Sequence, residues 1–268
     1  MSFAFADHAA GLLADLRVRV PGAEVMDDLP DVCRPKTLMD AYRIQARLRE
    51  LLSFRAPGPQ VGWKIGCTTP VMQSYLKIPH PCAGTLYRKS VCKRSIELRA
   101  ADFFTLGLEC EIAVRLAQDL PRLSQPRNSD SMLGTIAEVM ASIEIVEHRF
   151  TDFTKVRAPT LVADDFFSAG CVIGSPMKPS ELSDLRRLRG GFSIDDSRPE
   201  ATGSGEEILG HPLTALAWLA DHAAGLNTPL LKGQIVTLGS IVKTIYPEPG
   251  QVIEARIDRL PAAAVTVI

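Results

Sequence analysis

The chain has 268 residues, of which 46% are hydrophobic and 23% are charged, a composition typical of soluble globular proteins. Its net charge of -1 at pH 7 gives no electrostatic reason to expect a nucleic acid or an anionic membrane as a partner. The sequence has no apolar run long enough to span a bilayer, and its N-terminal segment lacks the basic region of a signal peptide. We therefore expect a cytoplasmic protein that binds neither nucleic acid nor membranes.

The cysteine pattern argues against a zinc site and against a disulfide-stabilised protein. Six cysteines are scattered along the chain, without a CxxC pair and without the Cys/His spacing of a zinc site. Free thiols in a reducing compartment are a simpler interpretation of this pattern than a disulfide framework.

The first 59 residues are predicted to be helical. Apolar positions recur at the helical period over residues 3–19, and a second helix is expected to run to Leu52 with Thr37 or Asp40 as its cap. The Pro-Gly-Pro sequence at 57–59 then breaks the chain. We expect a helical region over residues 1–59 and a β-rich catalytic domain over residues 60–268, an α+β fold.

Strands are predicted to dominate the remainder. We expect a short strand at 60–67, a helical piece at 71–76, a short helix at 132–140, a strand at 141–149 and a strand after a loop at 160–168. A meander is expected over 183–209, a helix at 213–224, and final strands at about 234–243, 251–258 and 263–268. The sequence contains neither GxGxxG nor GxxxxGK[ST], which argues against a Rossmann sheet or a P-loop.

Two glutamates share one face of the predicted strand at 108–116. Alternate strand side chains point to the same side, so Glu109 and Glu111 project together, while Cys110 and Ile112 belong to the opposite, apolar face. Like charges in a small space repel each other unless something compensates them. A divalent cation with oxygen ligands would do so. The alternative is an exposed strand edge on which both glutamates are solvated.

A third carboxylate favours the metal hypothesis. Glu144 lies inside the Ile/Val-rich run at 141–149, where a buried strand is expected. Three buried carboxylates without a cation would require costly protonation.

A lysine occurs in a similar apolar setting. Lys64 shares a strand face with Gly62 and Gly66, which we expect to leave open space beside the ammonium group, and Trp63 and Ile65 suggest that the segment is buried. A solvated edge lysine is one interpretation. A partly desolvated lysine that contacts a ligand and assists proton transfer is the other.

These motifs together resemble a known family. With GWKIG at 62–66, LECEIAV at 108–114 and IEIVEHR at 143–149 in this order, the chain resembles the 2-keto-4-pentenoate hydratases. That group is a branch of the fumarylacetoacetate hydrolase superfamily that also contains 2-oxo-3-hexenedioate (4-oxalocrotonate) decarboxylases. The AYRIQ run at 41–45, the GHPL run at 210–213 and the KGQIV run at 232–236 extend the resemblance over nearly the whole chain.

The resemblance implies a fold and a set of site residues. It implies a distorted β-roll or sandwich preceded by helices, assembled as a homo-oligomer. It also implies Mg²⁺ or Mn²⁺ bound by Glu109, Glu111 and Glu144, and Lys64 as the catalytic residue that contacts substrate. Asp164 and Ser240 are further expected substrate contacts, although Ser240 fits a turn-like strand position equally well.

The implied reaction begins with a small 2-oxo acid. Its carboxylate and C2 oxygens can chelate a hard cation, which would stabilise an enolate and allow water to add to the conjugated chain. Hydration is therefore the leading prediction. Decarboxylation of an oxo-hexenedioate, carbon–carbon bond hydrolysis, or ligand binding without turnover are the alternatives.

Three positions depart from the resemblance. Cys82 replaces an acidic residue of the hydratases, Asp165 replaces an asparagine, and Phe167 replaces a serine. A phenyl ring in place of a hydroxyl predicts a more apolar or differently shaped pocket, so the substrate could differ from the small dienoate.

Overall fold

The computed structural model describes residues 4–182, 184–199 and 201–268. The helices are α1 (Ala4–Arg17), α2 (Leu38–Ser53), α3 (Pro70–Leu76), α4 (Ser129–Met132), α5 (Ala158–Ala163) and α6 (Pro212–Gly225). The strands are β1 (Gln60–Gly66), β2 (Cys82–Tyr87), β3 (Val91–Lys93), β4 (Ser95–Leu98), β5 (Leu106–Leu116), β6 (Ile136–Glu147), β7 (Ser168–Ile173), β8 (Arg189–Ile194), β9 (Gly203–Ser204), β10 (Ile235–Ser240), β11 (Val252–Ile257) and β12 (Leu260–Val267).

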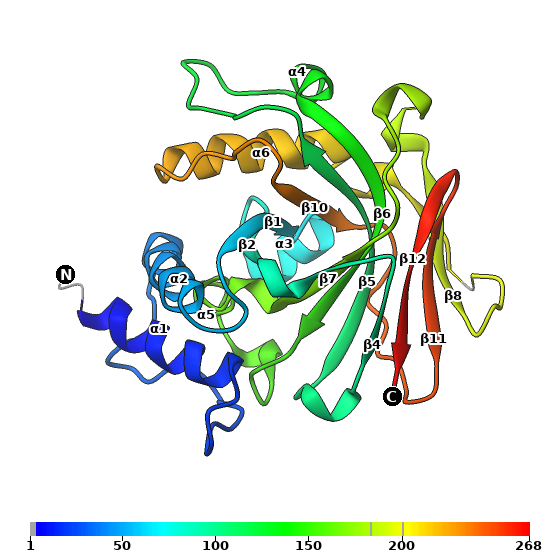
Figure 1. The fold of residues 1–268 in the computed structure, drawn as a ribbon. Helices are drawn as coiled ribbons and strands as arrows, with labels where there is room; N and C mark the ends of the chain where they lie inside the picture. The colour runs from blue at the N-terminus through cyan, green and yellow to red at the C-terminus, as the bar shows by residue number, and fades with distance from the viewer. Residues whose placement is uncertain (1–3, 183, 200) are drawn as a thin grey trace.

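The strands form two mixed sheets. The larger sheet has seven strands in the order β2-β1-β10-β5-β6-β7-β3, and the smaller has five in the order β4-β12-β11-β8-β9. Figure 1 shows the smaller sheet beside the long, curved strands β5 and β6, on the side away from α1 and α2. The predicted α+β class, helices followed by a β-rich mixed fold, is confirmed.

Strand β5 lies at the centre of the larger sheet, between β10 and β6. Cys110 and Ile112 on one face are fully buried, as predicted, and Glu111 on the other face is equally buried. The alternative of an exposed edge with solvated glutamates is therefore wrong. Because Glu111 is fully buried, its carboxylate must find its compensation inside the protein, whereas Glu109 is only half-buried.

The helix predicted over residues 132–140 is wrong. Helix α4 ends at Met132, and β6 runs without a break from Ile136 to Glu147. Antiparallel pairing with β5 extends along almost the whole of β6, and Val139 and Met140 are fully buried within it. This pairing overrides the helix propensity of the Ala, Glu and Met residues in the segment.

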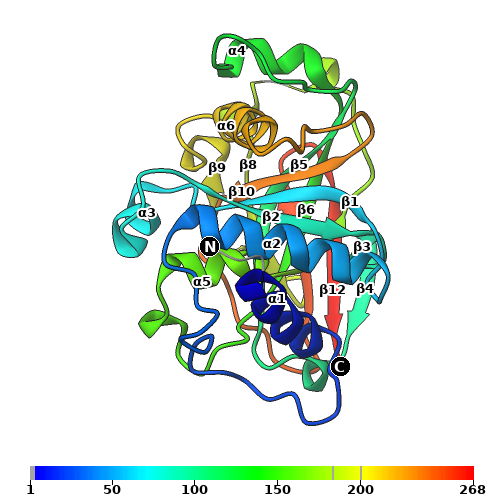
Figure 2. The same cartoon turned by 90° about the vertical axis from the view of Figure 1, so that its left-hand side faces the viewer.

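The N-terminal helices cover part of the larger sheet. In Figure 2, α1 and α2 lie in front of its strands, and α2 also packs against α5. One continuous hydrophobic core contains side chains from α1 through to β12, and the proposed division into residues 1–59 and 60–268 stays a prediction. Within the described ranges, no helix combines the length and the apolar character needed to cross a bilayer. All six cysteines are free thiols.

Helix α2 begins with a complete capping box, which gives the first testable prediction. Thr37 Oγ1 accepts a hydrogen bond from the Asp40 amide, and the Asp40 carboxylate accepts one from the Thr37 amide. Replacing Thr37 by Ala should lower the free energy of unfolding by about 1 kcal/mol, because the cap is lost. Denaturant titration measures the change. Thr37→Ser keeps the hydroxyl and should remain near the wild type; equal losses in both variants would contradict the capping role.

Candidate functional site

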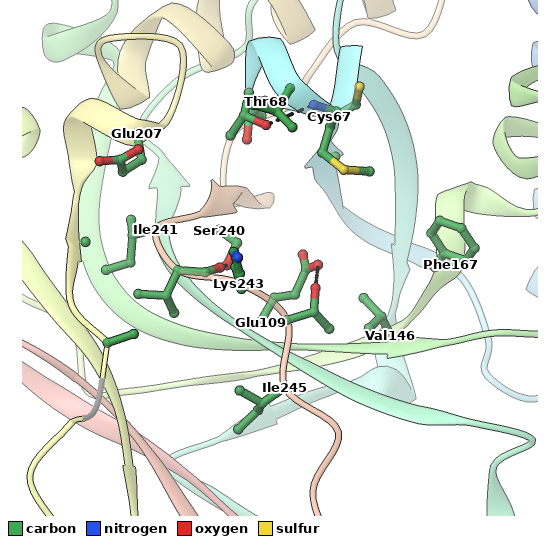
Figure 3. Close-up of a pocket in the computed structure, with 18 of the residues that line it drawn as sticks. Cys67, Thr68, Glu109, Val146, Phe167, Glu207, Ser240, Ile241, Lys243 and Ile245 are labelled. Carbon is green, nitrogen blue, oxygen red and sulfur yellow. Dashed lines mark hydrogen bonds between the residues drawn. The ribbon is translucent and has the colours of Figure 1, made fainter. Parts of the chain in front are cut away.

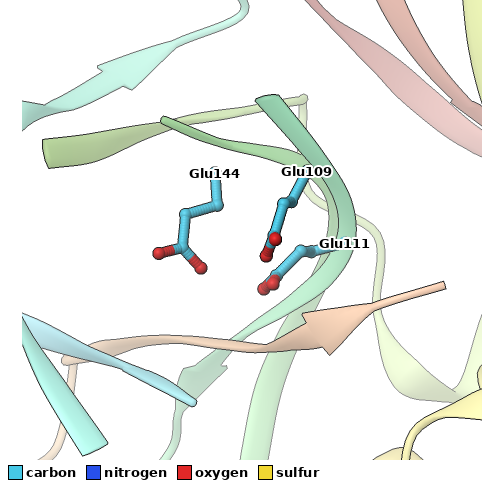
Figure 4. A group of neighbouring side chains, drawn as sticks. All are labelled: Glu109, Glu111 and Glu144. Carbon is cyan, nitrogen blue, oxygen red and sulfur yellow. The ribbon is translucent and has the colours of Figure 1, made fainter. Parts of the chain in front are cut away.

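Three glutamates from two neighbouring strands converge at the centre of the larger sheet (Figure 4). Glu109 on β5 stands directly opposite Glu144 on β6, and Glu111 follows two residues along β5. One carboxylate oxygen from each residue lies within 4.8 Å of those of the other two. We call these residues the glutamate cluster. The sequence prediction that they would meet is confirmed in its geometry.

The glutamate cluster is largely buried, and some of its carboxylate oxygens lack hydrogen-bond partners. Glu111 and Glu144 are both 0% exposed, whereas Glu109 is half-buried. Glu111 Oε1 and Glu144 Oε2 have no hydrogen-bond partner among the described residues. Burial and the neighbouring carboxylates raise the pKa of Glu111 well above its usual value. Burial likewise raises the pKa of Glu144, to about 7, against the opposing effect of Lys64.

Lys64 on β1 is the cation closest to this cluster within the described chain. It is 1% exposed, and its Nζ lies 2.9 Å from Glu144 Oε1. Burial alone would lower the Lys64 pKa, but the attraction of Glu144 and Glu109 outweighs burial and the pKa is raised. Lys64 is therefore a charged, desolvated ammonium group and not a solvated edge lysine.

The space expected beside Lys64 is filled. A side chain at Gly66 would meet the Phe166 ring at 2.3 Å, and one at Gly62 would meet the backbone oxygen of Ile235 at 2.1 Å. The prediction of open space is wrong, because these glycines allow neighbouring groups to approach the strand closely. One consequence is that the Phe166 ring lies 5.0 Å from Lys64 Nζ.

Two hydrogen-bond donors orient carboxylates of the glutamate cluster. One lies at the end of β10 and the other in the segment that follows β10. The Gly239 amide donates to Glu111 Oε2 at 3.1 Å, and the Thr244 hydroxyl donates to Glu109 Oε1. Gly239 has a φ of +118°, and a side chain there would meet Thr68 Oγ1 at 2.3 Å, so the close approach requires glycine. Each contact fixes one oxygen of its glutamate.

The donor set fits a divalent cation. Three carboxylates face a single ammonium group in a buried space, so the centre carries excess negative charge when all groups are ionised. Two buried carboxylate oxygens lack partners, as metal ligands do in the absence of the ion. Hard cations such as Mg²⁺ prefer carboxylate oxygens and keep further positions for other ligands.

A cavity of about 1540 Å³ opens onto this centre (Figure 3). Lys64, Glu109 and Ser240 border it, whereas Glu111 and Glu144 lie behind its lining. The Ser240 hydroxyl donates to the Val242 backbone oxygen at 2.6 Å, which leaves its oxygen able to accept a further bond. The cavity thus joins the predicted catalytic lysine, one carboxylate of the glutamate cluster and one predicted substrate contact.

Asp164, by contrast, does not border the cavity. Its Oδ1 lies 2.9 Å from Arg17 Nε, and its Oδ2 lies 3.0 Å from Arg149 Nη1. With the side chain 1% exposed and both oxygens paired with arginines, the geometry opposes the predicted substrate contact. Here two buried cations hold the carboxylate in place, and we do not include Asp164 among the proposed substrate contacts.

The same ion pairs hold the second part of the loop expected at 160–168. The first part of that segment is instead the end of α5, and the left-handed backbone after it was not predicted. Asp165, Phe166 and Phe167 follow α5 with consecutive positive φ values of 52°, 47° and 68°. The Asp165 carboxylate accepts bonds from the Thr85 amide and the Tyr87 hydroxyl, both at 3.0 Å. Three successive left-handed residues are costly and persist only where surrounding contacts enforce them. This loop places Phe166 and Phe167 at the cavity.

Comparisons with known proteins agree with this architecture. Over residues 87–268 the chain matches the model of the fumarylacetoacetate (FAA) hydrolase C-terminal family. It is 30% identical over 258 residues to a 2-keto-4-pentenoate hydratase of Burkholderia vietnamiensis, with 96% of each chain covered. It is 31% identical over 251 residues to the enzyme of that name from Paraburkholderia phymatum, with 93% of each chain covered.

A solved structure shares the fold. The 4-oxalocrotonate decarboxylase of Pseudomonas putida G7, complexed with magnesium and adipate, superposes with a TM-score of 0.91 at 22% identity. The match covers 100% of this chain and 99% of that one, and the expected fold type is thereby confirmed. On the family match and the identity to the hydratases, this chain belongs to the fumarylacetoacetate hydrolase family.

Proposed function

We propose that this protein is a divalent-metal-dependent hydratase that adds water to a 2-hydroxydienoate or 2-oxo-enoic acid. The observation that carries the proposal is the buried glutamate cluster beside Lys64 at the end of a cavity. Its relatives named 2-keto-4-pentenoate hydratase support the hydro-lyase class.

We assign the cation to Glu109, Glu111 and Glu144, with Mg²⁺ or Mn²⁺ as the ion. When bound, such an ion supplies Lewis acidity toward the C2 oxygen and the carboxylate of a 2-oxo acid. The cavity reaches the cluster only at Glu109, so substrate would approach from that side. The amide of Gly239 and the hydroxyl of Thr244 would hold Glu111 and Glu109 in position.

Lys64 is assigned to charge stabilisation and proton donation. Because its pKa is raised, the ammonium form dominates at neutral pH, and in this form it can give a proton or stabilise negative charge. It cannot take a proton from the substrate without first losing its own. Ser240 remains our proposed substrate contact, with its oxygen as an acceptor.

The alternatives differ in the bond that is made or broken. Addition of water to 2-hydroxypenta-2,4-dienoate gives 4-hydroxy-2-oxopentanoate and releases nothing, whereas decarboxylation of an oxo-hexenedioate releases CO₂. The similar fold of the Pseudomonas putida decarboxylase keeps the second reaction as the alternative. A cytoplasmic location stays a prediction from the sequence composition and the N-terminal segment, and assembly into a homo-oligomer stays a prediction from the family resemblance.

Metal-dependent turnover is the central prediction. The ultraviolet absorbance of 2-hydroxypenta-2,4-dienoate should fall with Mg²⁺ or Mn²⁺ present and should persist with a chelator. Glu111→Gln should weaken Mn²⁺ binding, measured by titration calorimetry, by about 100-fold or more, because it removes a ligand charge. Turnover should fall in parallel.

Glu138 offers a matched control on β6. It pairs with Arg115 at 2.7 Å, away from the glutamate cluster, so Glu138→Gln should keep wild-type metal affinity and turnover. Release of CO₂ from 2-oxo-3-hexenedioate without hydration of the dienoate would establish the decarboxylase instead. Absence of metal-dependent turnover with both substrates would contradict the enzymatic proposal and favour a non-catalytic binding protein.

A Lys64 variant should separate metal binding from chemistry. Lys64→Met removes the ammonium group and should reduce kcat by about 100-fold or more at saturating Mg²⁺. Mn²⁺ affinity should be kept or increased, because a competing cation has left Glu144. Steady-state kinetics and Mn²⁺ titration measure the two effects, with Lys89→Met on an exposed segment as the control. Equal losses of metal binding and turnover would mean that Lys64 only maintains the structure of the site.

Metal affinity should depend on pH. In the metal-free protein the pKa of Glu144 is about 7, so its carboxylate is increasingly protonated below that pH and increasingly available above it. Apparent Mn²⁺ affinity should therefore rise from pH 6 to pH 7.5, and deprotonation of Glu111, whose pKa is also raised, should add to the rise. Measuring free Mn²⁺ by electron paramagnetic resonance at each pH tests the trend. A constant affinity across this range would contradict the assignment of Glu144 as a ligand.

A further inference from the structure

A continuous group of rings forms one wall of the cavity. We call His148, Phe153, Phe166, Phe167 and Tyr246 the aromatic wall. Ring centroids are 4.4 Å apart for His148 and Phe153, 5.4 Å for Phe153 and Phe167, and 5.1 Å for Phe166 and Phe167. Tyr246 meets His148 edge-on at 5.6 Å. The rings therefore support one another and present a shared apolar surface.

The aromatic wall adjoins the proposed reaction centre. The Phe166 ring lies 5.0 Å from Lys64 Nζ, and in Figure 3 Phe167 and Val146 stand to one side of Glu109. Only Phe166 is deeply buried, whereas Phe153 and Phe167 are half-buried and Tyr246 is 54% exposed. Partly exposed rings that face a cavity are available to contact a ligand.

Charge along the cavity disfavours a second carboxylate at this wall. The described lining residues with basic side chains besides His148 are Lys64, which is paired with Glu144, and Lys243. Figure 3 draws Lys243 on the opposite side of Glu109 from Phe167. A carboxylate at the wall would lose its hydration without gaining a cation, which is costly.

His148 does not supply that cation. Burial and the neighbouring Arg149 lower the His148 pKa, and the ring is packed among Phe153, Phe167 and Tyr246. At neutral pH it contributes a neutral, largely apolar face to the wall.

The cavity is also larger than a five-carbon acid requires. Its volume of about 1540 Å³ exceeds the roughly 300–1,000 Å³ common for sites of small ligands. We propose that the aromatic wall is a subsite for an apolar tail, aryl or long alkyl, on the 2-oxo acid, with Phe167 as its main specificity-determining residue. This inference rests on the proposed function, which places the 2-oxo acid head at the glutamate cluster.

Binding of unreactive saturated acids tests the tail subsite without turnover. Calorimetry with Mg²⁺ would compare 2-oxopentanoate, 2-oxo-6-phenylhexanoate and 2-oxoadipate, which share the head and differ in the tail. Each buried methylene strengthens binding by about fourfold, so the phenyl acid should bind at least tenfold more tightly than 2-oxopentanoate. 2-Oxoadipate should bind no more tightly than 2-oxopentanoate.

Three variants test which residues cause the tighter binding of the phenyl acid. Phe167→Ala should remove most of the phenyl acid's advantage and change 2-oxopentanoate affinity by less than twofold. Tyr246→Ala, at an exposed position that tolerates truncation, should reduce the advantage by a smaller factor. Phe54→Ala is the matched control, because Phe54 is 91% exposed and does not line the cavity.

The outcomes separate this inference from the proposed function. Equal affinity for 2-oxopentanoate and the phenyl acid, or tightest binding of 2-oxoadipate, would overturn the tail subsite and leave the proposed function standing. Failure of all three acids to bind in a metal-dependent way would overturn the proposed function itself. Tail discrimination that survives in Phe167→Ala and Tyr246→Ala would place the subsite elsewhere in the cavity and overturn the role of the wall.

Discussion

Negative charge is concentrated at the centre of the larger sheet, where three carboxylates surround the ammonium group of Lys64. Two ionised carboxylates with oxygens within 4.8 Å of each other would repel by about 3 kcal/mol or more at an effective dielectric constant of 20. Repulsion of that size within a trio is comparable to the total stability of a domain, about 5–15 kcal/mol. Lys64 offsets only part of it. Protonation, favoured by the raised pKa values of Glu111 and Glu144, relieves part of this repulsion, and the pairing of β5 and β6 with neighbours on both sides holds the glutamate cluster in place.

Charged groups outside the glutamate cluster are also buried, and these groups are paired with one another. Arg17 from α1 donates to Asp164 and to the backbone oxygens of Asp164 and Ser168, and Arg149 donates to Asp164 and Ser168 as well. These bonds fix both ends of the left-handed loop that brings Phe166 against Lys64. Removing one partner of such a network leaves an uncompensated buried charge, which costs several kcal/mol. The N-terminal helix thus contributes to the site although it does not line the cavity.

Sequence periodicity predicted those features of the site that depend on residues close together along the chain. The two-residue repeat of a strand was sufficient to place Glu109 and Glu111 on one face, and a carboxylate in an Ile/Val-rich run was sufficient to select Glu144. Contacts between distant segments were not predictable in this way. Arg17 lies 147 positions from Asp164, and no local pattern links them, so the sequence does not predict the ion pair that holds this carboxylate. The helix predicted at 132–140 is wrong for the same reason, because pairing with β5 outweighs the helix propensity of this segment.

The residues proposed to carry out the reaction and the residue proposed to select the substrate lie on different parts of the chain. The proposed metal ligands come from β5 and β6, where a change of register would move every side chain on the strand. Phe167 comes from a loop anchored through other atoms, by Asp164 and Asp165. A substitution at Phe167 can therefore reshape the cavity without displacing a carboxylate. On our proposals, tail preference can therefore diverge while the metal ligands on β5 and β6 are kept. The aromatic wall is where we expect this chain to differ from relatives that act on smaller or doubly charged acids.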